Sequence, residues 1–96
     1  MNKTILITGA TSGIGKATAE FLASQGARLI LCGRRQERLD ALKEELPTEL
    51  HTLNFDVRNR AAVFEAIDSL PDAFTPIDVL INNAGNAHGL DDVVGA

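Results

Sequence analysis

The stretch of sequence that decides the fold is rich in glycine and reads Thr8-Gly9-Ala10-Thr11-Ser12-Gly13-Ile14-Gly15. Residues 3–8 are mostly β-branched or apolar, which predicts a buried strand. Beyond the glycines, apolar residues recur at the spacing of one helix face, namely Ile14, Ala17, Phe21 and Leu22. The sequence therefore predicts a strand, a tight turn and a helix in succession, with Gly26 ending the helix.

The same alternation continues along the rest of the chain. Apolar runs predict further strands at residues 28–32, 50–55 and 77–81. Apolar residues at helical spacing indicate two more helices, one through Leu39, Leu42 and Leu46 and one through Val63, Ala66, Ile67 and Leu70. Pro47 and Pro71 are expected to stop these helices, and residues 86–96 are predicted to form a loop. This order of elements predicts an α/β fold, in which right-handed crossovers give a parallel sheet with helices on both faces.

Length and composition limit the classes of protein to consider. The chain has 96 residues, enough for one domain, and its 45% apolar and 23% charged residues are globular proportions. A net charge of −4 argues against general binding to nucleic acids or anionic membranes. No apolar run could span a bilayer, the first residues lack a signal-peptide pattern, and Cys32 has no partner for an internal disulfide. We therefore expect a cytoplasmic protein with neither a membrane nor a nucleic-acid partner.

The glycine-rich turn has the features of a site for a dinucleotide's pyrophosphate. Glycine at position 9 permits the tight turn, Gly13 lets the backbone approach the phosphates, and Gly15 lets the helix pack closely on the sheet. The unpaired N–H groups and the positive dipole end of the helix would face the anion, and Thr11 and Ser12 can add hydroxyl donors. The predicted phosphate-binding residues are Gly9, Ala10, Thr11, Ser12, Gly13, Ile14 and Gly15. The alternative is an ordinary turn between a strand and a helix.

A second phosphate motif, the P-loop of nucleotide hydrolases, fits the sequence poorly. That motif requires a glycine where Ala10 stands and a hydroxyl where Ala17 stands. No cluster of Cys and His residues or of carboxylates along the chain shows the spacing of metal ligands. The sequence therefore predicts neither magnesium-nucleotide hydrolysis nor a metal site.

The end of the second predicted strand indicates which dinucleotide would bind. A carboxylate there would accept a hydrogen bond from the adenosine ribose of NAD, but this chain has Gly33 followed by Arg34 and Arg35. Guanidinium groups bind phosphate through paired, charge-assisted hydrogen bonds, so the two arginines at the start of the second helix predict a clamp for the 2′-phosphate of NADP. The alternative is that they form a solvated basic start to that helix.

Three motifs, each at a strand end, resemble those of the short-chain dehydrogenases/reductases. They are Thr8-Gly9-x-x-x-Gly13-x-Gly15, Asp56-Val57 and Asn82-Asn83-Ala84-Gly85. The resemblance covers the whole chain and implies a Rossmann-type, doubly wound parallel sheet with strand order 3-2-1-4. Residues 33–39 and 56–62 are similar to the subgroup of NADP-dependent 3-hydroxy acid dehydrogenases, which act on serine-like and other 3-hydroxy acids.

The resemblance also implies roles for individual residues. Asp56 would accept a hydrogen bond from the adenine amino group, with the backbone of Val57 alongside, although Asp56 could equally cap a helix. The backbone at Asn83 would contact the adenosine side of the cofactor, in a run with Ala84 and Gly85 that allows close approach. Asn82 would instead brace the neighbouring strand.

The catalytic groups of the family would follow residue 96. They are a serine, the tyrosine of Tyr-x-x-x-Lys and an asparagine, and this chain contains no tyrosine. No catalytic residue is therefore assigned, and residues 1–96 are expected to form the NADP-binding half-domain of an oxidoreductase. The resemblance implies a small-molecule substrate with a hydroxyl or carbonyl group and a parent protein that forms a homodimer or homotetramer. The alternatives are a non-catalytic nucleotide-binding module and a structural fragment that binds no ligand.

Overall fold

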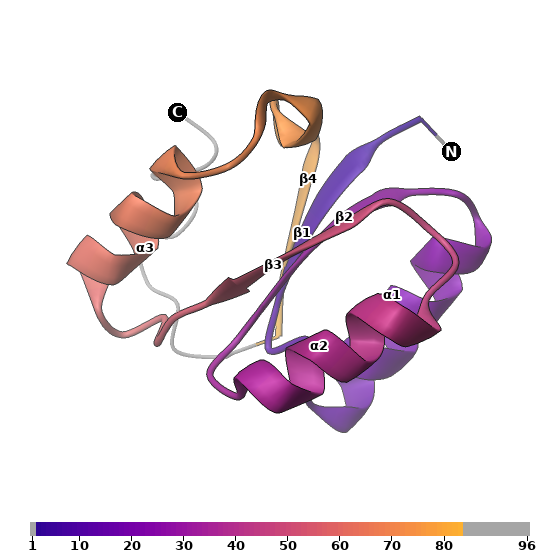
Figure 1. The fold of residues 1–96 in the computed structure, drawn as a ribbon, viewed down its shortest axis with the longest axis horizontal. Helices are drawn as coiled ribbons and strands as arrows, with labels where there is room; N and C mark the ends of the chain where they lie inside the picture. The colour runs from indigo at the N-terminus through magenta and orange to yellow at the C-terminus, as the bar shows by residue number, and fades with distance from the viewer. Residues whose placement is uncertain (1, 84–96) are drawn as a thin grey trace.

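Four parallel strands form one sheet in the order β3-β2-β1-β4 (Figure 1). The computed structural model describes residues 2–83, so the predicted loop over residues 86–96 lies outside the described part of the chain. The strands are β1 (Thr4–Thr8), β2 (Arg28–Gly33), β3 (Leu50–Asn54) and β4 (Val79–Asn82). Pairing is in parallel register throughout, with Leu6 opposite Ile30 in β2 and Leu80 in β4. The predicted fold class and strand order are confirmed.

Helices cover both faces of this sheet (Figure 1). Helices α1 (Gly13–Ser24) and α2 (Gln36–Glu45) lie on one face, while α3 (Arg60–Asp68) lies on the other, followed by the short 3-10 helix η1 (Asp72–Phe74). Two apolar clusters result, one on each face, and every residue of β1 is buried between them. This double burial explains why the strands are apolar at nearly every position. Within residues 2–83, no helix combines the length and apolarity needed to cross a membrane.

Helix α1 packs with a different face from the one that its large apolar residues indicated. Its buried residues are Gly15, Ala19 and Ala23, whereas Ile14 is 75% exposed and Phe21 is 63% exposed. Small side chains at this spacing bring the helix backbone close to the sheet, so the packed face carries little apolar volume of its own. Of the predicted face, only Leu22 contacts the core.

The helix ends follow local backbone chemistry. Gly26 adopts a positive φ of 80° directly after α1, as predicted for a glycine beyond a helix end. Helix α2 ends at Glu45, two residues before Pro47. Helix α3 is capped by Asn59, whose side-chain oxygen accepts a hydrogen bond of 3.1 Å from the N–H of Ala62. Asp56 therefore does not cap this helix, because the cap residue Asn59 lies three positions farther along the chain.

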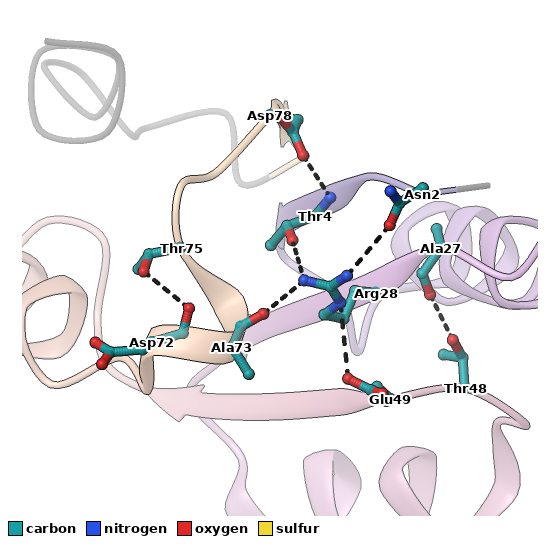
Figure 2. A network of polar contacts seen from close by, with 10 residues as sticks. All are labelled: Asn2, Thr4, Ala27, Arg28, Thr48, Glu49, Asp72, Ala73, Thr75 and Asp78. Carbon is teal, nitrogen blue, oxygen red and sulfur yellow. Dashed lines mark hydrogen bonds and ion pairs between the residues drawn. The ribbon is translucent and has the colours of Figure 1, made fainter.

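At the amino ends of the strands, Arg28 joins several elements through its guanidinium (Figure 2). This first residue of β2 donates to the Ala73 carbonyl in η1 at 2.6 Å and to the Thr4 hydroxyl of β1 at 3.4 Å. Its Nε lies 3.6 Å from a carboxylate oxygen of Glu49, directly before β3. Thr4 in turn donates its N–H to Asp78, the residue before β4, at 2.8 Å. The four strands are thus tied together at the end of the sheet that lies away from the glycine-rich turn.

Candidate nucleotide-binding site

A cavity of about 440 Å³ opens at the opposite end, where the strands finish. It is lined by residues at or beyond the carboxyl ends of all four strands, namely Gly9, Thr11, Ser12, Cys32, Gly33, Arg34, Arg35, Arg38, Phe55, Asp56, Val57, Arg58 and Asn83. The carboxyl ends of parallel strands, near the point where the strand order reverses, are where open α/β sheets bind ligands. Most of the residues predicted from the sequence therefore gather at one place.

Some predicted site residues lie elsewhere. Ala10 and Gly15 are buried beneath the turn, and Gly13 and Ile14 are exposed at the start of α1 without lining the cavity. The two further predicted residues, at positions 84 and 85, lie outside the described part of the chain. The roles of all these residues toward a ligand remain predictions.

The turn between β1 and α1 depends on two glycines. Gly9 has a φ of 63°, in the left-handed region that disfavours other residues. A Cβ atom on Gly15 would overlap the carbonyl oxygen of Gly9 and lie 2.8 Å from its carbonyl carbon. At Gly13, by contrast, an added Cβ would meet nothing within 4 Å. Gly15 therefore packs against the turn itself, and Gly13 leaves open space above the start of the helix.

The start of α1 presents hydrogen-bond donors without a competing negative charge. Ser12 caps the helix, since its hydroxyl accepts from the N–H of Gly15 at 3.2 Å and donates to the Gly9 carbonyl at 2.7 Å. The other N–H groups of the first turn lack partners within the helix, and this turn contains no acidic residue. A helix start of this kind attracts an anion through its dipole and its free donors.

Three arginines surround the part of the cavity that follows β2. Helix α2 begins at Gln36, so Arg34 and Arg35 precede it, rather than forming its first turn as predicted. Arg35 occupies the cap position without a side-chain cap hydrogen bond, and Arg38 follows within the helix. A Cβ on Gly33 would make only ordinary contacts, the nearest at 3.4 Å from the methyl group of Thr11. The positive charges of these arginines therefore lie close to Gly33, which has no side chain to occupy the space beside them.

Asp56 faces these arginines from the end of β3, and Arg58 holds it. One carboxylate oxygen accepts from the backbone N–H of Arg58 at 2.9 Å and from its Nε at 3.1 Å, while the other accepts from its Nη2 at 2.8 Å. A guanidinium nitrogen of Arg34 lies farther away, 3.6 Å from the second oxygen. The side-chain hydrogen bond from Arg58 is the main reason why the pKa of Asp56 lies well below its usual range. The carboxylate is therefore ionised at neutral pH.

On the other side of β1, a buried hydroxyl joins the ends of two strands. Thr8 donates to the side-chain oxygen of Asn82 at 2.9 Å and accepts from the backbone N–H of Asn83 at 3.1 Å. The expectation that Asn82 braces the neighbouring strand is confirmed. Within residues 2–83, the side-chain nitrogen of Asn83 is buried and has no hydrogen-bond partner, although its residue lines the cavity. A buried donor of this kind fits an acceptor on a ligand.

Comparison with known proteins identifies the family. The family model described as short chain dehydrogenase matches residues 3–93. The chain belongs to the short-chain dehydrogenase family. Serine 3-dehydrogenase of Rhizobium radiobacter is 51% identical over 89 residues, which make up 93% of this chain and 36% of that protein. NADP-dependent 3-hydroxy acid dehydrogenase YdfG of Escherichia coli K12 is 48% identical over 87 residues, or 91% of this chain and 35% of that one.

Solved structures give the same result for this short-chain dehydrogenase sequence. The closed form of a serine dehydrogenase complexed with NADP⁺ superimposes with a TM-score of 0.76 at 47% identity, covering 79% of this chain and 31% of that one. A short chain dehydrogenase from Bacillus anthracis gives a TM-score of 0.78 at 40% identity, with 85% and 34% covered. The chain thus spans about a third of the length of the relatives it matches, such as 36% of the serine 3-dehydrogenase.

Two charged residues that line the cavity of this short-chain dehydrogenase, Arg38 and Arg58, are not among the predicted site residues. Arg58 was not selected because it lies in no glycine motif and follows no apolar run. The available signal was its spacing, since an arginine two residues after a strand-end aspartate in a short loop can reach back to that carboxylate. No group of three or more potential metal ligands gathers within residues 2–83.

Proposed function

We propose that this chain forms the NADP-binding part of a short-chain dehydrogenase that transfers a hydride between NADP and a hydroxyl or carbonyl group of a small molecule. The observation that carries the proposal is the arrangement of one cavity. The start of α1, which attracts anions, borders one side of the cavity. Arg34, Arg35 and Arg38 line the side that follows Gly33. A dinucleotide with one extra phosphate has a pyrophosphate and a 2′-phosphate, and this cavity offers positive potential for both.

The residues that would hold the cofactor can be assigned from their positions. The turn from Gly9 to Gly15 would bind the pyrophosphate. The open space at Gly13 would let a phosphate group come close to the backbone there. Arg34 and Arg35 would bind the 2′-phosphate. The remaining residues would lie along adenine and its ribose, namely Asp56, Val57, Asn83, Ala84 and Gly85. The side-chain nitrogen of Asn83, which has no hydrogen-bond partner among residues 2–83, supports this fit, because a bound ligand could supply an acceptor.

The chemistry would be divided between the cofactor and the protein. NADP supplies or accepts the hydride when it is bound. The described residues orient the adenosine end of the cofactor, and no residue of this chain is proposed as the catalytic acid. We propose a 3-hydroxy acid or a serine-like compound as substrate, because relatives at 51% and 48% identity are named serine 3-dehydrogenase and NADP-dependent 3-hydroxy acid dehydrogenase. A cytoplasmic location and a homodimer or homotetramer complete the proposal.

Cofactor preference tests the proposal most directly. In the protein at its full natural length, Arg34→Ala is expected to weaken NADP binding by about 10-fold, the low end for a charge-assisted hydrogen bond, because the side chain is largely solvated. NAD binding is expected to change little. Gly33→Asp should reduce NADP binding further and improve NAD binding, since the new carboxylate would repel the phosphate and accept from the ribose. Isothermal titration calorimetry with both cofactors measures each affinity.

Two results would contradict this proposal. One is a wild-type preference for NAD, and the other is an equal loss of both cofactors in Arg34→Ala. Turnover of serine or 3-hydroxypropanoate with NADP, followed by absorbance of NADPH, separates an oxidoreductase from a nucleotide-binding module without catalysis.

A further inference from the structure

The cavity combines several positive charges with a single negative one. Among the described residues that line it, four are arginines, Asp56 is the only acid, and the others carry no charge. A carboxylate here is unfavourable for binding a phosphate group, because like charges repel within about 10 Å at moderate salt. The site therefore needs a means of neutralising Asp56 if it is to accept a phosphate on the ribose.

Arg58 meets that need by its geometry. Its guanidinium and its backbone N–H together engage both oxygens of Asp56, at distances of 2.8 to 3.1 Å. The carboxylate lies at the surface of the cavity, with its side chain 34% exposed, so it could otherwise reach other cations. This pairing cancels the negative charge locally and keeps the carboxylate oxygens oriented.

The pairing of Arg58 with Asp56 also leaves Arg34 available to bind a ligand phosphate. Its Nη1 lies 3.6 Å from the oxygen of Asp56 that Arg58 already contacts at 2.8 Å. If Arg58 were absent, Arg34 would be the nearest remaining cation to that oxygen in the described part of the cavity. Arg34 would then neutralise Asp56 in place of binding a ligand. A single substitution at Arg58 would therefore make two positive charges, those of Arg58 and Arg34, unavailable for binding a phosphate.

We propose that Arg58 is a specificity-determining residue, which neutralises Asp56 and thereby allows the cavity to select a dinucleotide with a 2′-phosphate. This inference rests on the proposed NADP site and adds a residue that acts through Asp56 and Arg34 rather than on the phosphate. Arg58 favours NADP over NAD because only NADP carries the 2′-phosphate, whose additional negative charge an unneutralised Asp56 would repel. The shared adenine group contributes equally to both affinities.

The chain offers a matched control for the loss of one positive charge. Arg60 lies two residues farther on, and its guanidinium stacks over the ring of Phe64 at 5.5 Å from the centroid. It does not line the cavity. Arg60→Ala therefore removes the same charge from the same region of the chain without freeing Asp56.

The test measures the ratio of NADP to NAD affinity in the protein at its full natural length. Isothermal titration calorimetry is carried out with Arg58→Ala, Arg58→Gln, Arg60→Ala, Asp56→Asn and the double variant Asp56→Asn/Arg58→Ala. Both Arg58 variants are expected to lower the ratio by about 3- to 10-fold, as one unpaired charge at short range would do. Arg60→Ala should leave the ratio unchanged. The loss should shrink at high salt, and melting temperatures recorded in parallel identify any variant that does not fold.

The double variant distinguishes the proposed role from direct phosphate binding. If Arg58 acts by neutralising Asp56, removing the carboxylate as well should restore most of the NADP preference. A loss that persists in the double variant would overturn the inference, because Arg58 would then contact the phosphate itself. Equal effects of Arg58→Ala and Arg60→Ala would also overturn it. Failure of the underlying NADP proposal is recognised separately, since the wild-type protein would then not prefer NADP.

Discussion

The buried hydroxyl of Thr8 donates a hydrogen bond of 2.9 Å to the side-chain oxygen of Asn82 and so connects the ends of β1 and β4. The hydroxyl oxygen of Thr8 also accepts a hydrogen bond of 3.1 Å from the backbone N–H of Asn83. Thr8 is fully buried, whereas Asn82 is exposed and Asn83 is half-buried, so water can replace part of what the hydroxyl provides to these partners. The position of Asn83 beside the cavity therefore depends on the Thr8 side chain of the neighbouring strand β1.

Replacing this hydroxyl should destabilise the fold. Thr8→Val keeps the side-chain shape but removes the hydroxyl, and we expect the free energy of unfolding to fall by about 0.5–1.5 kcal/mol, the usual net contribution of a hydrogen bond. Thr8→Ser retains the hydroxyl and should cost less. Urea unfolding followed by circular dichroism measures the difference, and a Thr8→Val variant as stable as wild type would show that this bond contributes nothing.

Gly13 and Gly15, both in the first turn of α1, should respond differently to substitution by alanine. Gly15→Ala forces a methyl group against the carbonyl of Gly9, and overpacking of this kind typically costs about 1–3 kcal/mol. Gly13→Ala meets no atom within 4 Å, so stability should hold or rise slightly, because alanine favours helix more than glycine does. Thermal melts of both variants test this. Equal destabilisation by the two alanines would contradict the geometry.

Cys32 should be unreactive in the folded protein. The residue is 1% exposed, and burial raises the pKa of its thiol, so almost no thiolate forms at neutral pH. A chromogenic disulfide reagent is expected to label it only after urea unfolding, which provides the positive control. Rapid labelling under native conditions would mean that this end of β2 opens readily.

His51 should give stability a specific pH dependence. Burial is the main reason why its pKa lies below its ordinary value, and nearby Lys43 adds to the effect. The folded protein therefore binds fewer protons than the unfolded chain at pH values below about 6.5, so stability should rise with pH through that window and level off above it. His51→Gln should flatten this part of the profile in thermal melts. An unchanged slope would assign the dependence to other groups.

Much of the fold was predictable because its signals are local. Apolar runs located the strands, and Gly26 and Pro47 marked helix ends through their own backbone restrictions. The packed face of α1 was not predictable in the same way. The spacing of large apolar residues predicted a packed face that includes Ile14 and Phe21. Close approach of the helix to the sheet instead requires small side chains, which a pattern of large apolar residues does not reveal.

The site was predictable where chemistry depends on one residue and its neighbours. The glycine turn and the arginines after β2 were found by motif, and the structure brings most of them to one cavity. The contact between Asp56 and Arg58 was missed because it depends on the path of the loop after β3, which Asn59 ends by capping α3. The two-residue spacing indicates that Arg58 can reach the carboxylate of Asp56, but not whether the short loop folds so that it does.

The contacts of Arg28 and the arginine-lined cavity lie at opposite ends of the same strands. A five-residue strand such as β1 separates them by roughly 16 Å, and substitutions that far apart usually have additive effects on stability. Residues around the cavity can therefore be changed without compensating substitutions at the far end of the sheet. The Arg28 end is therefore the place to add stabilising substitutions before the residues around the cavity are redesigned.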